Sequence, residues 1–217
     1  MSARTVLVTG FEPFDGDECN PSREIALALD GSEIAAHRVV GAALPTEFAR
    51  APQVLEELIE RHAPALVLAL GLAASRAGLG LERVALNWID ARIPDNAGAQ
   101  PVDVPVVAGA ATAYLANLPL KAMLARLQAA GIDATLSHSA GTFVCNQVFF
   151  ALAHRIATRA APLRGGFVHV PCLPAQAARH RAAAPMELAT MIEGVRLCID
   201  TALTAPADLQ FAAGAID

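Results

Sequence analysis

The feature that most constrains the fold is an alternation between short β-prone apolar runs and longer amphipathic helical patterns. Residues 5–11 (TVLVTGF) and 65–70 (ALVLAL) are continuously apolar at their centres. Such runs are typical of strands that are buried on both faces of a sheet. Strands that alternate with helices over the whole length predict an α/β fold, with an open, mostly parallel twisted sheet and helices on both faces.

Local signals place the individual elements. Further strands are expected at 33–44, 79–89, 133–139 and 166–170, and helices at 20–31, from Thr46 onward, at 119–130, from Thr142 to about Ile156, and from Pro185 onward. Asn20 before Pro21 is a helix start with an asparagine cap and a proline in the first turn. The segment 90–107, with three prolines and an Asp-Asn-Ala-Gly turn, predicts irregular structure.

Length and composition limit the class of protein. The 217 residues suit one domain, 1–217, in which 205–217 is expected to be a loosely ordered tail. A hydrophobic fraction of 54% with 17% charged residues argues against disorder. The longest uncharged stretch, 134–154, holds too many polar residues for a membrane span. A net charge of −5 without a lysine or arginine block argues against nucleic acid as a partner.

The four cysteines are far apart and form no CxxC pair. The start of the chain lacks the apolar core and cleavage site of a signal peptide. Together these features predict a cytoplasmic protein with reduced thiols, without a disulfide framework and without a metal site.

The chemistry is expected at Cys145. The β-prone run before it ends in Ala-Gly-Thr, and a helical pattern then begins, with Thr142 as a plausible N-cap. Cys145 would then lie in the first helical turn, where free N–H groups and the helix dipole favour a thiolate, the nucleophilic form of the side chain. The alternative is that Cys145 is a small buried hydrophobe, which is common for a cysteine.

Two further residues have routes to the same place. His169 ends a predicted strand, and Glu82 shares a strand face with Val84, Leu86 and Trp88, where a carboxylate is out of place unless something there requires it. A cysteine nucleophile needs a base and a group that orients the base. Taken singly, His169 could be a core histidine and Glu82 a structural ion-pair partner.

Four separate segments resemble the pyroglutamyl peptidase I (pyrrolidone-carboxylate peptidase) family of cysteine peptidases. They are residues 6–22 (VLVTGFEPFDGDECNPS), 80–98 (GLERVALNWIDARIPDNAG), 139–147 (SAGTFVCNQ) and 165–176 (GGFVHVPCLPAQ). The resemblance implies a three-layer α/β/α sandwich, a catalytic triad of Cys145, His169 and Glu82, and hydrolysis of the bond after an N-terminal pyroglutamyl residue through a thioester on Cys145. It departs at Leu72 and Ala175, where family members often carry glutamine and glutamate.

The same resemblance implies a substrate site. Its expected residues are Phe11, Phe14, Asn20, Thr46, Arg92, Ile93, Phe143 and Val144. An apolar slot formed by Phe11, Phe14 and Phe143 with Ile93 would accept the flat, neutral lactam ring and reject a charged N-terminus, whose desolvation is costly. Ordinary core packing is the alternative for the phenylalanines, and it is less expected for Phe11 and Phe14 because they flank Pro13 in a loop.

The resemblance further implies that the partners are peptides with an N-terminal pyroglutamate and further copies of the chain, as a dimer or tetramer, and no cofactor is expected. Two other functions remain open from the residues alone. One is a binding module that captures pyroglutamyl peptides without cleaving them. The other is a different α/β hydrolase or a phosphorylase, although the bulky residues between Gly10 and Gly16 make a poor phosphate loop.

Overall fold

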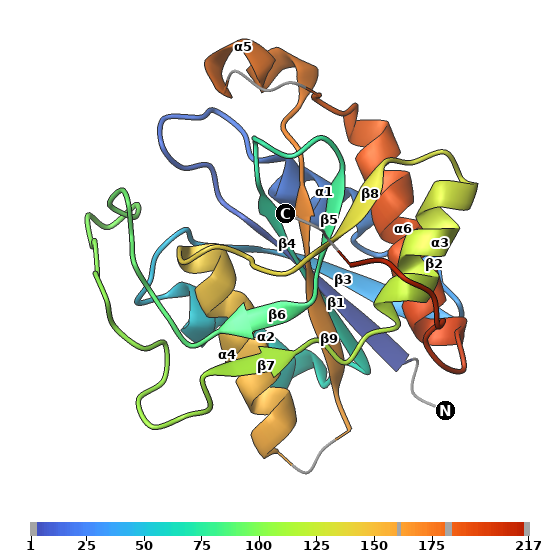
Figure 1. The fold of residues 1–217 in the computed structure, drawn as a ribbon, viewed down its shortest axis with the longest axis horizontal. Coiled ribbons are helices and arrows are strands. Elements are labelled where there is room, and N and C mark those ends of the chain that lie inside the picture. Colours follow the sequence, from blue (N-terminus) through green and yellow to red (C-terminus); the bar gives the residue numbers. More distant parts are fainter. Residues whose placement is uncertain (1–3, 160–161, 181–183, 215–217) are drawn as a thin grey trace.

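The computed structural model describes residues 4–159, 162–180 and 184–214, and a seven-stranded sheet forms its centre (Figure 1). The strand order is β2-β3-β1-β4-β9-β5-β8. The strands are β1 (Arg4–Phe11), β2 (Glu33–Ile34), β3 (His37–Leu44), β4 (Leu66–Leu72), β5 (Leu79–Glu82), β8 (Ala134–Ser137) and β9 (Arg164–Val170). The four central strands β3, β1, β4 and β9 are parallel, whereas β5 and β8 run against them at one edge and β2 at the other.

Helices cover both faces of this sheet, which confirms the predicted α/β/α sandwich (Figure 1). One layer contains α1 (Pro21–Leu29), α3 (Leu120–Ala129) and α6 (Leu188–Thr204). The other contains α2 (Ala51–His62) and α4 (Val144–Thr158). A short 3₁₀ helix, η1 (Pro174–Gln176), and α5 (Ala177–His180) follow β9, and α5 projects from the body at the top of Figure 1.

The core has two halves, one on each face of the sheet. Every residue of β4 is buried, as its uninterrupted apolar sequence predicts for a central strand. Alternate side chains of β1 and β4 therefore enter opposite halves: Val6 and Leu68 pack toward α1 and α6, and Leu7 and Ala69 pack toward α2 and α4.

Two predicted strands are each divided in the structure. The run 33–44 forms β2 and β3, which pair as an antiparallel hairpin because Ala35 and Ala36 adopt positive φ angles. The run 79–89 ends its pairing with the main sheet at Glu82. Its continuation, β6 (Val84–Leu86), pairs with β7 (Ala113–Leu115) in a separate two-stranded sheet. The expectation that Glu82 shares a face with Val84 and Leu86 is therefore wrong.

The helix starts agree with the sequence only in part. Asn20 caps α1 as predicted, since its side-chain oxygen accepts from the backbone N–H of Ser22 at 3.1 Å. Thr46 is not a cap, because α2 begins at Ala51 and the Thr46 hydroxyl donates to the Glu12 carbonyl. The last helix begins at Leu188, three residues after Pro185.

The segment expected to be a loose tail forms specific contacts over its described residues, 205–214. Asp208 accepts a hydrogen bond from the backbone N–H of Ala122 at 2.9 Å, in the first turn of α3. The Lys121 ammonium lies 5.5 Å from the centre of the Phe211 ring. These contacts attach the segment to α3.

None of the helices in the described ranges combines the length and apolarity that a bilayer crossing requires.

Candidate active site

Cys145 lies in the first turn of α4, as the sequence predicts. The chain reaches this helix from β8, an edge strand, and crosses toward the middle of the sheet through residues 138–143. The thiol sulfur then lies directly against β4: a Cβ atom added to Gly71 would stand 2.8 Å from Cys145 Sγ. The absence of a side chain at position 71 is therefore what allows the sulfur to approach the sheet.

His169 lies near the end of β9 and Glu82 at the end of the neighbouring strand β5. Both side chains are almost completely buried. The imidazole Nδ1–H donates to Glu82 Oε1 at 2.7 Å. Because an ionised carboxylate only accepts, this contact places the proton of a neutral imidazole on Nδ1 and leaves Nε2 free to accept one.

The strand register brings the sulfur and the imidazole to the same part of the sheet. Gly71 in β4 is paired directly with His169 in β9. Paired residues of neighbouring strands present their side chains on the same face. The Phe167 ring, whose centre is 4.9 Å from that of His169, also lies under position 71. Cys145, His169 and Glu82 are thus grouped on the face covered by α4.

The electrostatics of the thiol differ from the expectation of a stable thiolate. Burial, together with the negative charge of Glu82, raises the pKa of the Cys145 thiol to about 12, although its own backbone N–H favours the ionised form. Desolvation therefore outweighs the helix N-terminus. A raised pKa favours the protonated thiol, so a base is needed to take the proton as the sulfur attacks.

The N-terminus of α4 keeps its N–H groups free of any side-chain cap. The cap position is occupied by Phe143, and Thr142 instead donates its hydroxyl proton to the Asp90 carbonyl at 2.8 Å. The expectation that Thr142 caps this helix is wrong. Uncapped N–H groups beside a nucleophile are suited to hold the negative oxygen of a tetrahedral intermediate.

Aromatic residues from three loops and helix starts meet beside this helix. Phe14 and Phe143 are half-buried, with ring centres 6.1 Å apart. Phe48, which the sequence did not single out, meets Phe143 edge-on at 5.1 Å. The three rings form a partly exposed apolar wall near Cys145, which follows Phe143 by two residues.

Two of the expected contact residues are buried instead. Phe11, the last residue of β1, is only 2% exposed and packs on Phe167 at a ring distance of 6.5 Å. Val144 is fully buried at the start of α4. The expectation that Phe11 avoids core packing is wrong, because the side chain of this last residue of β1 enters the core beside Phe167.

Asn20 and Thr46 converge on the loop that follows β1. The Asn20 amide nitrogen and the Thr46 hydroxyl both donate to the Glu12 carbonyl, at 3.2 and 2.9 Å. Both residues are nearly inaccessible to solvent. In this structure they fix the backbone of the loop that carries Phe14.

Arg92 and Ile93 lie on the irregular segment that the sequence predicted, and they are exposed and half-buried, respectively. This segment is held by its neighbours. Asp95 accepts from the backbone N–H of Phe48 at 2.7 Å, and Asn96 donates to the Pro13 carbonyl at 3.0 Å. The loops that bear the aromatic wall are thereby joined to the segment containing Arg92.

Arg76 is the main charged residue of the site that the sequence reasoning missed. Its Nη2 forms an ion pair with Glu82 Oε1 at 2.8 Å, so that one carboxylate oxygen is shared between Arg76 and His169. The signal available in the sequence was only that a buried carboxylate requires a cation.

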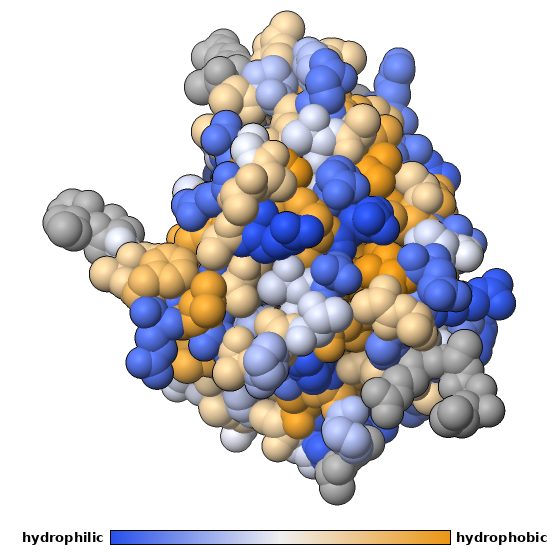
Figure 2. Space-filling model, turned by 90° about the vertical axis from the view of Figure 1, so that its right-hand side faces the viewer, coloured by the Kyte–Doolittle hydropathy of each residue, from blue (hydrophilic) through white to orange (hydrophobic). Residues whose placement is uncertain are grey.

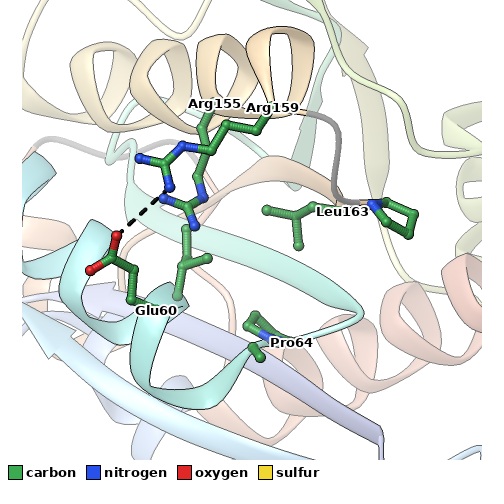
Figure 3. Close-up of a pocket in the computed structure, with 8 residues that line it drawn as sticks. Glu60, Pro64, Arg155, Arg159 and Leu163 are labelled. Atoms are coloured by element: carbon green, nitrogen blue, oxygen red, sulfur yellow. Dashed lines mark ion pairs between the residues drawn. The ribbon is translucent and has the colours of Figure 1, made fainter.

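A separate cavity of about 260 Å³ lies between the ends of α2 and α4 (Figure 3). It is lined by Glu60, Pro64, Arg155, Arg159 and Leu163, among others. These residues precede the starts of β4 and β9 in the chain, so the cavity lies at the opposite end of these strands from His169, which is near the end of β9. Its arginines already pair with Glu56 and Glu60.

In the described ranges, no three His, Cys, Asp or Glu residues form a group that could hold a metal ion.

Comparison with known proteins decides the family. The family model described as pyroglutamyl peptidase matches residues 4–205. The chain belongs to the pyroglutamyl peptidase family. It is a cysteine-type pyroglutamyl peptidase by that membership, and neither a phosphorylase nor a binding module is favoured.

Relatives match the pyroglutamyl peptidase chain over nearly its whole length. The pyrrolidone-carboxylate peptidase of Cupriavidus taiwanensis is 49% identical over 95% of this chain and 96% of its own. That of Bacillus cereus is 43% identical over 98% and 99%. Among solved structures, pyroglutamyl peptidase I from Bacillus amyloliquefaciens has a TM-score of 0.93 at 36% identity, covering 96% of this chain and 99% of that one. A mutant pyrrolidone carboxyl peptidase from P. furiosus has a TM-score of 0.90 at 41% identity, covering 93% and 99%.

Proposed function

We propose that Cys145, His169 and Glu82 carry out the pyroglutamyl peptidase reaction of this chain, as nucleophile, general base and orienting carboxylate. The observation that supports this most is the strand register. It pairs Gly71, which contacts the Cys145 sulfur, with His169, whose imidazole donates to Glu82 at 2.7 Å. Nucleophile, base and orienting group are the parts that a covalent peptidase needs.

The reaction proceeds in two halves. As Cys145 Sγ attacks the pyroglutamyl carbonyl carbon, the thiol proton moves to His169 Nε2, which is free because Nδ1–H is bonded to Glu82. A bond from sulfur to carbon forms, the amide C–N bond breaks, and the imidazolium gives its proton to the leaving amine. Water then attacks the thioester with His169 as base, which releases pyroglutamate and restores the thiol.

The groups around Cys145 stabilise or disfavour the charges that appear during the reaction. A thiol whose pKa is raised to about 12 does not ionise by itself near neutral pH, so His169 must take the proton during attack. Glu82 has two opposite effects: it disfavours a bare thiolate, and it stabilises the imidazolium that forms. The uncapped N–H groups of α4 would hold the carbonyl oxygen while it carries negative charge.

For the substrate we propose that the pyroglutamyl ring lies against Phe14 and Phe143, and that Ile93 lines another side of the same slot. The first two rings are half-buried and face each other at 6.1 Å. Phe11 and Val144 would support this slot from beneath, and Asn20 and Thr46 would fix its loop through the Glu12 carbonyl. The exposed Arg92 would contact the peptide outside the slot.

The direct test compares two chromogenic amides that differ only in the ring, pyroglutamyl and prolyl. The neutral lactam enters an apolar slot without losing the hydration of a charged amine, so the purified chain should favour it by several orders of magnitude in kcat/KM. Equal turnover of the two amides, or turnover of neither, would contradict the proposal.

We also propose that the chain is a single domain which works in the cytoplasm as a dimer or tetramer. All four cysteines are free thiols, which suits a reducing compartment.

Large apolar side chains are exposed at Trp88, Val102, Val104 and Leu115, of which Leu115 lies in β7. By contrast, the face bearing α3 and α6 alternates between apolar and polar areas (Figure 2). Light scattering during size-exclusion chromatography, with Leu115→Glu as the variant, tests self-association through the β6–β7 surface; a monomeric wild type would contradict it.

A further inference from the structure

The carboxylate of Glu82 is buried in a way that one neutral histidine does not explain. Its side chain has no exposed surface, and its Oε1 accepts a hydrogen bond from His169 Nδ1 at 2.7 Å and forms an ion pair with Arg76 Nη2 at 2.8 Å. Within the described residues, Oε2 has no hydrogen-bond partner. A buried carboxylate without a counter-charge is strongly unfavourable. When the imidazole is neutral, Arg76 supplies the positive charge, because a guanidinium stays protonated.

Arg76 is itself held in place by hydrogen bonds to the chain at and just after the end of β8. Its Nη2 donates to Ser137 Oγ at 2.8 Å and to the Ser139 carbonyl at 3.3 Å. Both acceptors belong to the end of β8 and the start of the segment that leads to Cys145. The guanidinium therefore connects Glu82 to the chain that carries the nucleophile.

The guanidinium also requires a particular strand residue beneath it. A Cβ atom at Gly80 would stand 2.6 Å from Arg76 Nη1 and 3.0 Å from its Cζ. Gly80 is paired directly with His169 across β5 and β9. Two strand glycines are thus paired with His169, one in each neighbouring strand. Gly71 in β4 leaves room for the Cys145 sulfur, and Gly80 in β5 leaves room for the Arg76 guanidinium.

We propose that Arg76 is a positioning residue of this peptidase, which keeps Glu82 ionised and directed toward His169. The proposal rests on the assignment of Cys145 and His169 made above. Arg76 does not touch the reacting atoms; it acts through Glu82. A carboxylate oxygen shared between an arginine and the imidazole is fixed in direction, so the imidazole keeps the orientation in which Nε2 accepts the thiol proton.

The shared oxygen also has a consequence for pH. The charged and titratable groups around His169 are Glu82 from β5, Cys145 from α4 and Arg76 from the segment before β5. Arg76 competes for the carboxylate and adds positive charge, and both effects disfavour the imidazolium. Without Arg76, the buried Glu82 loses its permanent counter-charge, so the Glu82–His169 pair as a whole should take up a proton more readily, which extends the inactive protonated form to higher pH.

The test uses Arg76→Gln, Arg76→Lys and Gly80→Ala in the full chain, with a chromogenic pyroglutamyl amide. Arg76→Gln should lower kcat by about 10- to 100-fold with little change in KM, because the base is misplaced while the slot is intact. The acidic limb of its kcat/KM profile should move to higher pH. Arg76→Lys should recover part of kcat. Gly80→Ala keeps every charge but displaces the guanidinium, so it should lower kcat in the same way.

A double-mutant cycle separates positioning from a general structural role. If Arg76 acts through Glu82, then Arg76→Gln should have almost no further effect on kcat once Glu82→Gln is present. Independent, multiplying effects would overturn the proposal. Wild-type kcat and an unmoved pH profile in both Arg76→Gln and Gly80→Ala would also overturn it.

Two controls complete the experiment. Arg196→Gln removes an exposed arginine that pairs with Glu193 on α6, and it should leave kcat and the pH profile unchanged. Cys145→Ala reports on the proposed function: if it retained turnover, the triad assignment itself would fail. An inactive Cys145→Ala beside a fully active Arg76→Gln would overturn the role of Arg76 alone.

Discussion

Cys145 and Gly71 are in such close contact that a methyl group on Gly71 would stand 2.8 Å from the cysteine sulfur. The same methyl group would stand 2.8 Å from the Phe167 ring. Gly71 shows no positive φ angle, so its role is the space it leaves rather than its backbone conformation. The position of the nucleophile over the sheet therefore depends on a glycine in β4.

This contact predicts the result of Gly71→Ala. The added carbon must push the sulfur or the Phe167 ring away from its place, at a cost of about 1–3 kcal/mol in stability. Activity should fall much further than stability, because misplacing a nucleophile by about 1 Å can reduce the rate 100-fold. Steady-state kinetics beside thermal unfolding measure both. Gly214→Ala, where nothing lies within 4 Å, is the control. An alanine variant with wild-type kcat would contradict the placement of the sulfur.

The ionisation of Cys145 gives a second prediction. In His169→Ala the base is gone, and alkylation of Cys145 by iodoacetamide should become rapid only toward the alkaline pKa of about 12. Adding Glu82→Gln removes a negative charge that raises this pKa. The pKa of the Cys145 thiol should therefore be lower in the double variant than in His169→Ala. Mass spectrometry of the Cys145 peptide measures the rate against pH. A profile that stays fixed or moves to higher pH would refute the electrostatic account.

The loop that carries Phe14 is held from outside by the segment after β9. Asp17 forms an ion pair with Arg179 Nε at 3.0 Å, contacts His180 Nε2 at 2.7 Å, and accepts a hydrogen bond from Gln176 Nε2 at 3.2 Å. Asp17→Asn removes the charge that joins these groups, so the loop should loosen and KM should rise several-fold while kcat changes little. Glu193→Gln, which breaks a surface pair on α6, should leave KM unchanged. An unaltered KM in Asp17→Asn would show that this contact does not support the slot.

The C-terminal segment predicts a stability effect without a kinetic one. Asp208 accepts from the Ala122 N–H at the start of α3, a helix whose cap residue, Pro119, provides no side-chain bond. Asp208→Ala should lower the free energy of unfolding by about 1 kcal/mol, as the loss of a helix cap typically does. Urea unfolding measures this, and kcat should stay at the wild-type value. No change in the urea midpoint would mean that the segment contributes nothing to α3.

The sequence predicted most of the sheet, because buried central strands such as β1 and β4 are continuous apolar runs that few other structures accommodate. It also indicated Cys145, His169 and Glu82 as a group, and the structure places them on one face of the sheet. It missed the division of 79–89 after Glu82, because the apolar pattern continues into β6 while the pairing partner changes. Local pattern does not encode which strand a residue pairs with.

The same limit explains the missed contacts within the site. Arg76 is separated from Ser137 by 61 positions, and Gly71 meets Cys145 only because β4 passes beneath the start of α4. The burial of Phe11 depends on Phe167 in a distant strand. The raised pKa of the Cys145 thiol follows mainly from desolvation, which becomes visible only when the surrounding elements are in place.

The most direct measurement of the central claim is turnover of a chromogenic pyroglutamyl amide by Cys145→Ala beside Cys198→Ala. Cys198 is a matched control, since the pKa of its thiol is likewise raised to about 12, but it lies in α6 and faces the other core half. With both variants folded, Cys145→Ala should show no turnover above background and Cys198→Ala should retain it. Turnover by Cys145→Ala at a rate near that of the wild type would contradict the account.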